Sequence, residues 1–236
     1  MKAPRAVLFD LDDTILSTDA TADASWRETC ERVQQALPGV DAETLFQELL
    51  KQRAWYWSDA SRHTRGRLRL PMAREEIAAL ALAKLGVRAP ELPRLMASTY
   101  TALAAEKITP FPRAIETLEW LRGRGVRLGL ITNGASEVQR WKINRFALAK
   151  HFDVIVVEEE FGIGKPDPSV FQYALREVGV HPRDAWMVGD RLDWDIIPSQ
   201  ALGIAGVWND YRKAGLPPDA GVVPSRIVHS IAELIS

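Results

Sequence analysis

The sequence predicts an α/β fold in which helices cover both faces of a parallel sheet. Short apolar runs alternate with stretches of helical periodicity through the second half of the chain. The first apolar run, Ala6–Phe9, ends abruptly at Asp10-Leu11-Asp12-Asp13-Thr14. A stretch of roughly ninety residues with helical patterns and no strand pattern then separates this run from the rest, which indicates an insertion into the sheet domain.

The apolar run before Asp10 is typical of a buried parallel strand whose carboxyl end opens onto a polar crevice. Ligands bind at that edge in open α/β sheets. Because a strand projects alternate side chains to the same side, Asp10 and Asp12 can face one small volume, where they repel each other unless a cation or a shared proton intervenes. The pair can supply a nucleophile and metal ligand in Asp10 and a proton donor in Asp12. An ordinary strand-ending turn rich in Asp and Thr is the alternative.

Four helices are expected between the first strand and Pro110. Their apolar positions lie in 26–37, 45–50, 72–85 and 92–103, with Pro38-Gly39 closing the first helix and Asp41 capping the second. The basic stretch from Arg62 to Arg69 is interpreted as a solvated surface loop between helices, with contact to an anionic substrate as the alternative. These patterns predict an inserted helical domain at residues 16–107, with the sheet domain formed by 1–15 and 108–236.

Helices and strands alternate from Pro110 onward. Strands are expected at 126–131, 154–157, 185–188 and 204–208, and helices around 115–121, 136–146, 170–178 and 196–202. Gly203 is well placed to stop the last of these helices. Repeated βα units of this kind predict a parallel sheet with helices on both faces.

Polar groups follow two of the later strands. Thr132 comes directly after 128–131, where its hydroxyl and the nearby amides can hold a phosphoryl oxygen, or where it can cap the next helix. Asp190 ends the strand at 185–188, and Asp193 and Asp195 follow it within a few residues. Carboxylates suit Mg²⁺, although acids are also favoured at a helix start by its macrodipole.

Lys165 lies in the loop Gly164-Lys165-Pro166-Asp167-Pro168. The two prolines stiffen this loop, so the ammonium group would be presented from a fixed base. A solvated loop lysine is the alternative reading. The occurrence of Lys165 and the other polar groups at successive strand ends favours a single site.

Composition excludes several classes of protein. The 236 residues carry a formal net charge of −1, which argues against a broad nucleic-acid-binding surface. Cys30 is the only cysteine, so an intrachain disulfide and a cysteine metal cage are excluded, and a reducing compartment is expected. The N-terminus lacks a signal-peptide pattern, and no apolar run reaches membrane-spanning length. We expect a cytoplasmic, soluble monomer or homodimer whose partner is neither a membrane nor a nucleic acid polymer.

Four ordered motifs resemble those of the haloacid dehalogenase-like (HAD) hydrolase superfamily. They are Asp10-Leu11-Asp12-Asp13-Thr14, Thr132-Asn133, Lys165-Pro166 and Gly189-Asp190 with Asp195. The resemblance spans nearly the whole chain and implies a Rossmann-like core with a helical cap inserted after the first strand. Four segments are most similar to the N-acylneuraminate-9-phosphatase and pyrimidine 5′-nucleotidase branch: Thr132-Asn133-Gly134, Phe152–Val157, the Lys165 loop and Met187-Val188-Gly189-Asp190.

The resemblance implies an Mg²⁺-dependent phosphatase acting on a small phosphorylated metabolite, a sugar phosphate or a nucleotide. Asp10 would form an aspartyl-phosphate, and Asp12 would act as general acid and then general base. Thr132, Asn133 and Lys165 would bind the phosphoryl group. The metal ligands implied are Asp10, Asp12 through its main-chain carbonyl, Asp190 and Asp195, the last in part through water.

Other functions compete with this interpretation. The resemblance argues against an alkyl halide substrate, because the dehalogenase branch lacks an acid at the position of Asp12. A phosphomutase of the same fold and a non-catalytic phosphometabolite-binding protein are the alternatives. A signalling receiver domain also uses an acidic Mg²⁺ site, but it carries its phosphorylated Asp on a later strand and lacks a large insertion.

Overall fold

The computed structural model describes residues 3–37 and 39–235, so the expected helix closure at Pro38 lies outside the described residues. Contacts within the chain divide it into two compact units. The core unit comprises residues 1–17 and 109–236, and the helical unit comprises residues 18–108. No helix of the described residues is long and apolar enough to cross a membrane.

The core unit is built on a six-stranded parallel sheet with the strand order β3-β2-β1-β4-β5-β6. The strands are β1 (Ala6–Phe9), β2 (Arg127–Thr132), β3 (Val154–Val157), β4 (Ala185–Gly189), β5 (Ala205–Asn209) and β6 (Arg226–Val228). The predicted parallel sheet is confirmed. Strand β6 is not predicted from the sequence, because it has only three residues, one of them the exposed Ile227.

The central strand β1 is buried throughout and pairs with β2 on one side and β4 on the other. Leu8, for example, lies opposite Gly129 of β2 and Met187 of β4. The chain builds β2 and β3 outward from β1 and then returns to place β4 on its other side. This reversal forms the topological switch point at which open α/β sheets bind ligands, and Asp10 and Asp190 directly follow the two strands that flank it.

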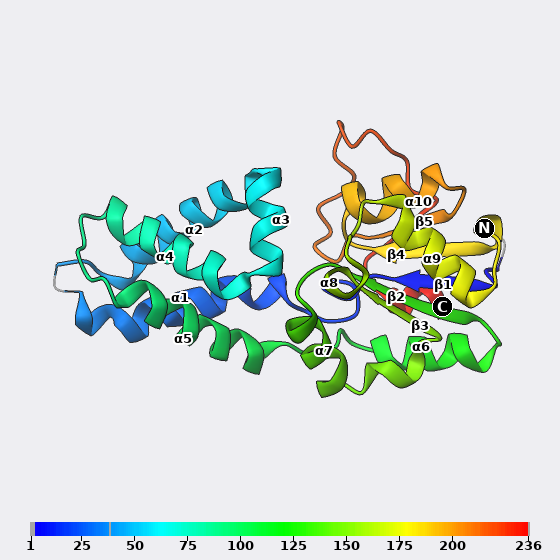
Figure 1. Ribbon diagram of the computed structural model, residues 1–236, viewed down its shortest axis with the longest axis horizontal. Helices are drawn as coiled ribbons and strands as arrows, with labels where there is room; N and C mark the ends of the chain where they lie inside the picture. The colour runs from blue at the N-terminus through cyan, green and yellow to red at the C-terminus, as the bar shows by residue number, and fades with distance from the viewer. Residues whose placement is uncertain (1–2, 38, 236) are drawn as a thin grey trace. The chain divides into compact units, whose positions relative to one another are not determined.

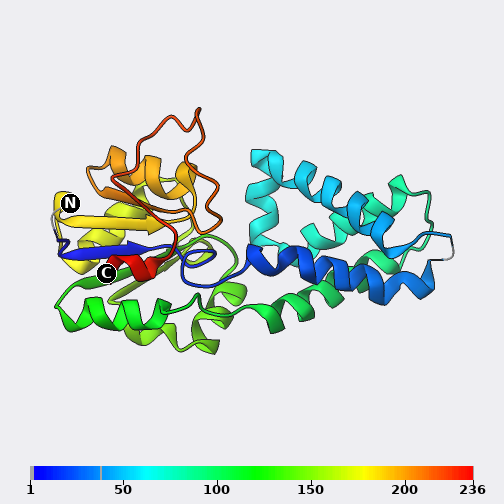
Figure 2. The ribbon, with the colours of Figure 1, turned by 180° about the vertical axis from the view of Figure 1, so that it is seen from behind.

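Helices cover both faces of the sheet. They are α6 (Ala114–Gly123), α7 (Ser136–Arg145), α8 (Glu158–Phe161), α9 (Pro168–Val178) and α10 (Ile197–Ala201). Figures 1 and 2 show α9 over one face and α6 over the other. Phe171 and Ala174 of α9 pack with Leu8 and Met187 in one hydrophobic cluster. Gly129 permits this packing, because a Cβ atom there would lie 2.7 Å from Leu8 Cδ2.

The helical unit has its own hydrophobic core, in which the rings of Trp26 and Tyr100 stack with centroids 4.0 Å apart. Its helices are α1 (Ala22–Val33), α2 (Ala42–Ser58), α3 (Ala60–Leu68), α4 (Leu70–Lys84) and α5 (Leu92–Lys107). Asp41 caps α2 as expected, accepting a hydrogen bond from the amide of Thr44.

The interpretation of the stretch from Arg62 to Arg69 as a loop is wrong, because most of it forms α3. Asp59 caps this helix by accepting a hydrogen bond from the Arg62 amide. The Arg62 guanidinium lies 3.8 Å from the ring centroid of Trp55 and donates to main-chain carbonyls at the end of α2. Arginine is a good helix former, and these local contacts outweigh the charge repulsion that suggested a loop.

Candidate functional site

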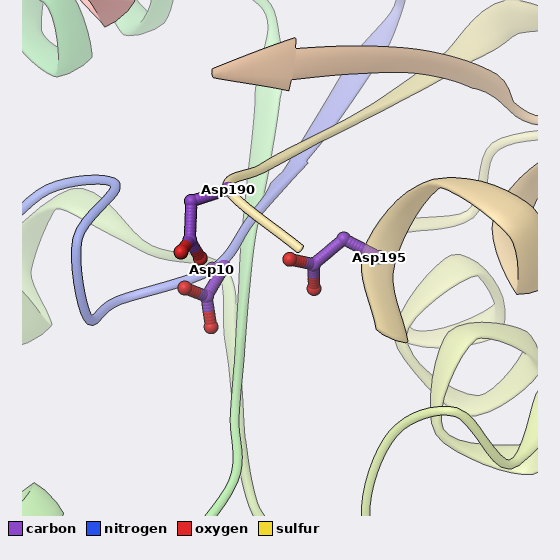
Figure 3. A group of neighbouring side chains, drawn as sticks. All are labelled: Asp10, Asp190 and Asp195. Carbon is purple, nitrogen blue, oxygen red and sulfur yellow. The ribbon is translucent and has the colours of Figure 1, made fainter. Parts of the chain in front are cut away.

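Three carboxylates meet at the switch point of the sheet. Asp10 follows β1, Asp190 follows β4, and Asp195 lies in η5 (Leu192–Ile196), the single helical turn after β4. Each offers an oxygen atom, and these oxygens all lie within 4.8 Å of one another. Figure 3 shows the three side chains gathered around one small space. Hard oxygen ligands in such a group suit a divalent cation such as Mg²⁺.

Lys165 supplies a positive charge to this group of carboxylates. Its Nζ lies 2.5 Å from Asp10 Oδ1 and 2.7 Å from Asp195 Oδ1, and the residue is only 2% exposed. The alternative of a solvated loop lysine is therefore excluded. A buried ammonium that bridges two carboxylates satisfies charges that burial would otherwise make very costly.

Asn133 holds the main chain of Lys165 from both sides. Its Nδ2 donates to the Lys165 carbonyl at 2.7 Å, and its Oδ1 accepts from the Lys165 amide at 2.8 Å. The sequence predicted that Asn133 binds phosphate. The side chain observed here is engaged with the lysine loop, and the predicted phosphate contact stays a prediction.

Lys165 alone does not balance three ionised carboxylates, and the pKa values of the group reflect this. Burial raises the pKa of Asp10 to about 7, against the lowering influence of Lys165. Burial, together with the neighbouring Asp10 and Asp195 carboxylates, raises the pKa of Asp190 to about 9. Although burial opposes the charge of Lys165, the two carboxylates hold its pKa above the ordinary range. A divalent cation would supply the positive charge that keeps these carboxylates ionised, and the oxygen donor set fits such an ion.

The residues after Asp10 form a tight turn. Asp13 adopts a positive φ of 58°, a conformation that Asp tolerates better than most residues. The Thr14 hydroxyl returns to donate to Asp10 Oδ2 at 3.3 Å. The turn therefore fixes the Asp10 carboxylate while the chain leaves the sheet.

The side chain of Asp12 contacts α7. Lys142 Nζ lies 2.7 and 2.8 Å from the two Asp12 carboxylate oxygens. Gln139 Nε2 donates to Asp12 Oδ2 at 3.0 Å and also to the Thr132 hydroxyl, and Gln139 Oε1 accepts from Lys142 at 2.8 Å. Thr132, Gln139 and Lys142 are all buried, so Asp12 and Thr132 belong to one hydrogen-bonded network.

Thr132 does not cap the helix that follows it. The N-cap position of α7 is Ala135, which makes no side-chain capping hydrogen bond. The structure thus brings the predicted residues into two adjoining sets on the core unit. One set is Asp10, Lys165, Asp190 and Asp195 with Asn133 behind the lysine, and the other is Asp12 with Thr132.

Sequence reasoning missed Gln139 and Lys142. A signal was present, because the helix at 136–145 has few apolar residues and must bury polar side chains if it packs at all. Gln139 and Lys142 are three residues apart and therefore share one helix face. A polar pair on one face of a helix that directly follows the loop after β2 is a pattern that can be searched for in sequence.

Comparisons with known proteins agree with this geometry. Residues 4–203 match the family model described as haloacid dehalogenase-like hydrolase. The chain is 34% identical over 208 residues to the glyceraldehyde 3-phosphate phosphatase of Methanopyrus kandleri, covering 86% of this chain and 82% of that protein. It is 29% identical over 249 residues to the N-acylneuraminate-9-phosphatase of Homo sapiens, covering 98% of this chain and 92% of that protein.

A similar fold is found in the crystal structure of the putative HAD-hydrolase YfnB from Bacillus subtilis. The TM-score is 0.76 at 23% identity, and the match covers 99% of this chain and 97% of that one. The likeness at this identity concerns the fold, and it extends over both units of the chain.

Proposed function

Because the chain belongs to the haloacid dehalogenase-like hydrolase family, we propose that it is an Mg²⁺-dependent phosphatase that hydrolyses a small phosphomonoester through an aspartyl-phosphate on Asp10. One observation carries this proposal. Asp10 lies at the switch point of the sheet with Lys165 Nζ 2.5 Å from one of its oxygens and Asp190 and Asp195 beside it. A carboxylate nucleophile, a fixed cation and a metal-ligand set are the parts that phosphoryl transfer requires.

In the first step an Asp10 oxygen attacks phosphorus, and the bond from phosphorus to the substrate oxygen breaks. Asp12 donates a proton to that leaving oxygen, so the product departs as a neutral alcohol. The Lys165 ammonium and the Thr132 hydroxyl stabilise the charge on the transferring oxygens. Splitting hydrolysis in this way replaces one difficult step by two easier ones.

In the second step water attacks phosphorus of the aspartyl-phosphate. Asp12, now a carboxylate, takes a proton from that water, and Asp10 is released with inorganic phosphate. The metal would be held by Asp10, Asp190, the Asp12 main-chain carbonyl and Asp195, the last in part through water. When bound, it supplies positive charge that neutralises the phosphoryl oxygens.

The names of the relatives support a small phosphorylated metabolite as the substrate class. The relatives are named as phosphatases of glyceraldehyde 3-phosphate and of an N-acylneuraminate phosphate, both small phosphorylated sugars or sugar derivatives. We include nucleotides because this chain is 37% identical over 131 residues, 55% of its length, to the pyrimidine 5′-nucleotidase YjjG of Escherichia coli, covering 57% of that protein. The helical unit would serve as a cap that selects the substrate's leaving group. The protein would work in the cytoplasm as a monomer or homodimer.

The test is release of inorganic phosphate from p-nitrophenyl phosphate, followed by a panel of sugar phosphates and nucleotides. Activity is expected with Mg²⁺ and is expected to disappear with a chelator or with Asp10→Asn. Asp193→Asn is the matched control, because the Asp193 carboxylate pairs with Arg191 at the surface and should not affect turnover. Full activity of Asp10→Asn would refute the covalent mechanism. Stable phosphorylation of Asp10 without phosphate release would favour a phosphomutase or a binding protein.

A further inference from the structure

We propose that Lys142 and Gln139 of α7 are positioning residues that fix the Asp12 carboxylate and direct the Thr132 hydroxyl toward the transferring phosphoryl group. The inference rests on the proposed function, since it assigns a task to two side chains that the phosphatase mechanism does not itself use. It is carried by a closed set of hydrogen bonds among four side chains of the core unit.

The ion pair with Lys142 fixes the orientation of the Asp12 carboxylate. Lys142 Nζ lies 2.7 and 2.8 Å from the two Asp12 oxygens, so the ammonium group sits symmetrically across the carboxylate. The Lys142 side chain is 8% exposed, whereas that of Asp12 is 31% exposed. The lysine therefore holds Asp12 from the protein side, and the exposed part of the carboxylate is left for a substrate.

The orientation of the Gln139 amide follows from its neighbours. Lys142 can only donate, so the Gln139 atom 2.8 Å from its ammonium group is the carbonyl oxygen. The amide nitrogen must then face Asp12 Oδ2 and the Thr132 hydroxyl, both of which can accept. These neighbours therefore determine which end of the Gln139 side-chain amide is the oxygen and which is the nitrogen.

The same contact determines what the Thr132 hydroxyl can do. Because the Gln139 amide donates to the Thr132 oxygen, the hydroxyl hydrogen points elsewhere and is available as a donor. A phosphoryl oxygen accepts hydrogen bonds and never donates them when it is ionised. Gln139 therefore sets the Thr132 hydroxyl in the orientation that phosphate binding requires.

The position of these residues in the sequence explains how one helix serves both groups. Thr132 ends β2, and α7 begins four residues later at Ser136. Gln139 and Lys142 lie on the same face of α7, which buries both of them. Arg140, by contrast, pairs with Glu160 at the surface. Burial of a lysine costs free energy, and the ion pair between Lys142 and Asp12, the proposed general acid, offsets that cost.

The expected consequence is a dependence on the leaving group. A misplacement of a catalytic group by about 1 Å can cost about 100-fold in rate. Alkyl phosphates need the proton that Asp12 supplies, whereas p-nitrophenyl phosphate has a leaving group that departs without one. Loss of Lys142 should therefore impair alkyl phosphates far more than p-nitrophenyl phosphate.

The experiment measures kcat and KM of the full-length, Mg²⁺-loaded enzyme for p-nitrophenyl phosphate and for the best alkyl phosphate of the panel. The variants are Lys142→Met, Lys142→Arg and Gln139→Leu, each alone and with Asp12→Asn. Lys150→Met is the control, because Lys150 is an exposed lysine of the same unit that the mechanism does not use. Thermal unfolding of each variant verifies its fold.

We expect Lys142→Met to lower kcat for the alkyl phosphate about 10- to 100-fold more than for p-nitrophenyl phosphate, with KM little changed. Lys142→Arg should recover part of the alkyl phosphate activity that Lys142→Met loses. In the Asp12→Asn background Lys142→Met should no longer change the ratio of the two activities, because Lys142 acts through Asp12. Lys150→Met should leave both activities unchanged.

Equal losses on both substrates, or a change in the ratio that persists in the Asp12→Asn background, would overturn the inference. If Lys142→Met does not fold, Gln139→Leu decides in its place. A higher ratio of p-nitrophenyl phosphate activity to alkyl phosphate activity than in the wild type supports the inference, and an unchanged ratio overturns it. The proposed function fails in a different way. An Asp12→Asn variant without any leaving-group dependence, or an Asp10→Asn variant with full activity, would refute the mechanism before Lys142 is considered.

Discussion

Gly189 at the end of β4 lies directly against the side chain of Asp195. A Cβ atom on Gly189 would stand 2.6 Å from Asp195 Cβ and closer still to the carboxylate. The space that a side chain would fill is therefore occupied by an acid of the proposed metal site. Asp195 is buried and receives hydrogen bonds from Lys165 Nζ and from the Arg191 amide, so it has little freedom to move aside.

Replacing Gly189 with alanine should displace the Asp195 carboxylate. We expect Gly189→Ala to lower the free energy of unfolding by about 1–3 kcal/mol, as overpacking of a buried site does, and to weaken Mg²⁺-dependent activity. Urea unfolding and Mg²⁺ titration of phosphate release measure the two effects. Gly123→Ala is the matched control: a Cβ atom there has no neighbour within 4 Å, so stability should stay within about 1 kcal/mol of the wild type. Comparable losses in both variants would show that the contact with Asp195 is unimportant.

Asp190 should be required for metal binding and dispensable for folding. The Asp190 carboxylate lies beside those of Asp10 and Asp195. Burial, together with these neighbours, raises its pKa to about 9. The raised pKa means that Asp190 favours its protonated form, and Mg²⁺ binding has to remove that proton. A neutral amide cannot replace the resulting carboxylate as a ligand. We expect saturating Mg²⁺ to raise the Tm of the wild type but not that of Asp190→Asn.

In differential scanning calorimetry the metal-free Asp190→Asn variant should unfold close to the metal-free wild type. Asp193→Asn serves as the comparison, because it removes a nearby exposed carboxylate that pairs with Arg191. That variant should keep the Mg²⁺-dependent shift. An undiminished shift in Asp190→Asn would place the metal elsewhere.

The acidic group could be anticipated from sequence because parallel strands bring their carboxyl ends to one edge. Asp10 and Asp190 directly follow apolar runs, so the sheet alone determines that they lie near each other. Gln139 and Lys142 are different. Whether they face Asp12, about 130 positions earlier in the chain, depends on the rotation of α7 about its axis, and that rotation is set by packing.

The fold prediction differs from the structure at two places, Arg62–Arg69 and β6. The stretch at Arg62–Arg69 carries clustered positive charge and no apolar periodicity, yet α3 forms because Asp59 caps it and Arg62 stacks on Trp55. Strand β6 has three residues and pairs with β5 at the edge of the sheet. Three residues are too few for an alternating apolar pattern to be recognised in the sequence.

The Asn133 side chain should be needed to hold Lys165 in place. Its two hydrogen bonds to the Lys165 main chain, at 2.7 and 2.8 Å, tie the lysine loop to the end of β2. We expect Asn133→Ala to lower the free energy of unfolding by about 1–3 kcal/mol, since both main-chain groups lose a partner. Activity should fall more than stability alone explains, because Lys165 Nζ would no longer be fixed beside Asp10.

Phosphate-release assays under conditions where the variant is fully folded separate these two effects. Asn144→Ala is the control, an exposed asparagine on α7 whose replacement should change neither stability nor activity appreciably. Unchanged kcat in a folded Asn133→Ala variant would contradict the positioning role of Asn133.

Cys30 should report on opening of the helical unit. It is the only cysteine of the chain, it lies on α1 with no exposed surface, and burial raises its pKa from 9.0 to about 12. Because the thiolate is the reactive form, iodoacetamide should label the folded protein slowly at pH 8 and rapidly in guanidinium chloride. Folding favours the protonated thiol, so this group leaves stability unchanged below about pH 9 and lowers it as the pH rises from 9 toward 12. Mass spectrometry of labelling against urea concentration should follow unfolding of the helical unit, and rapid labelling of the native protein at pH 8 would show that α1 does not protect Cys30.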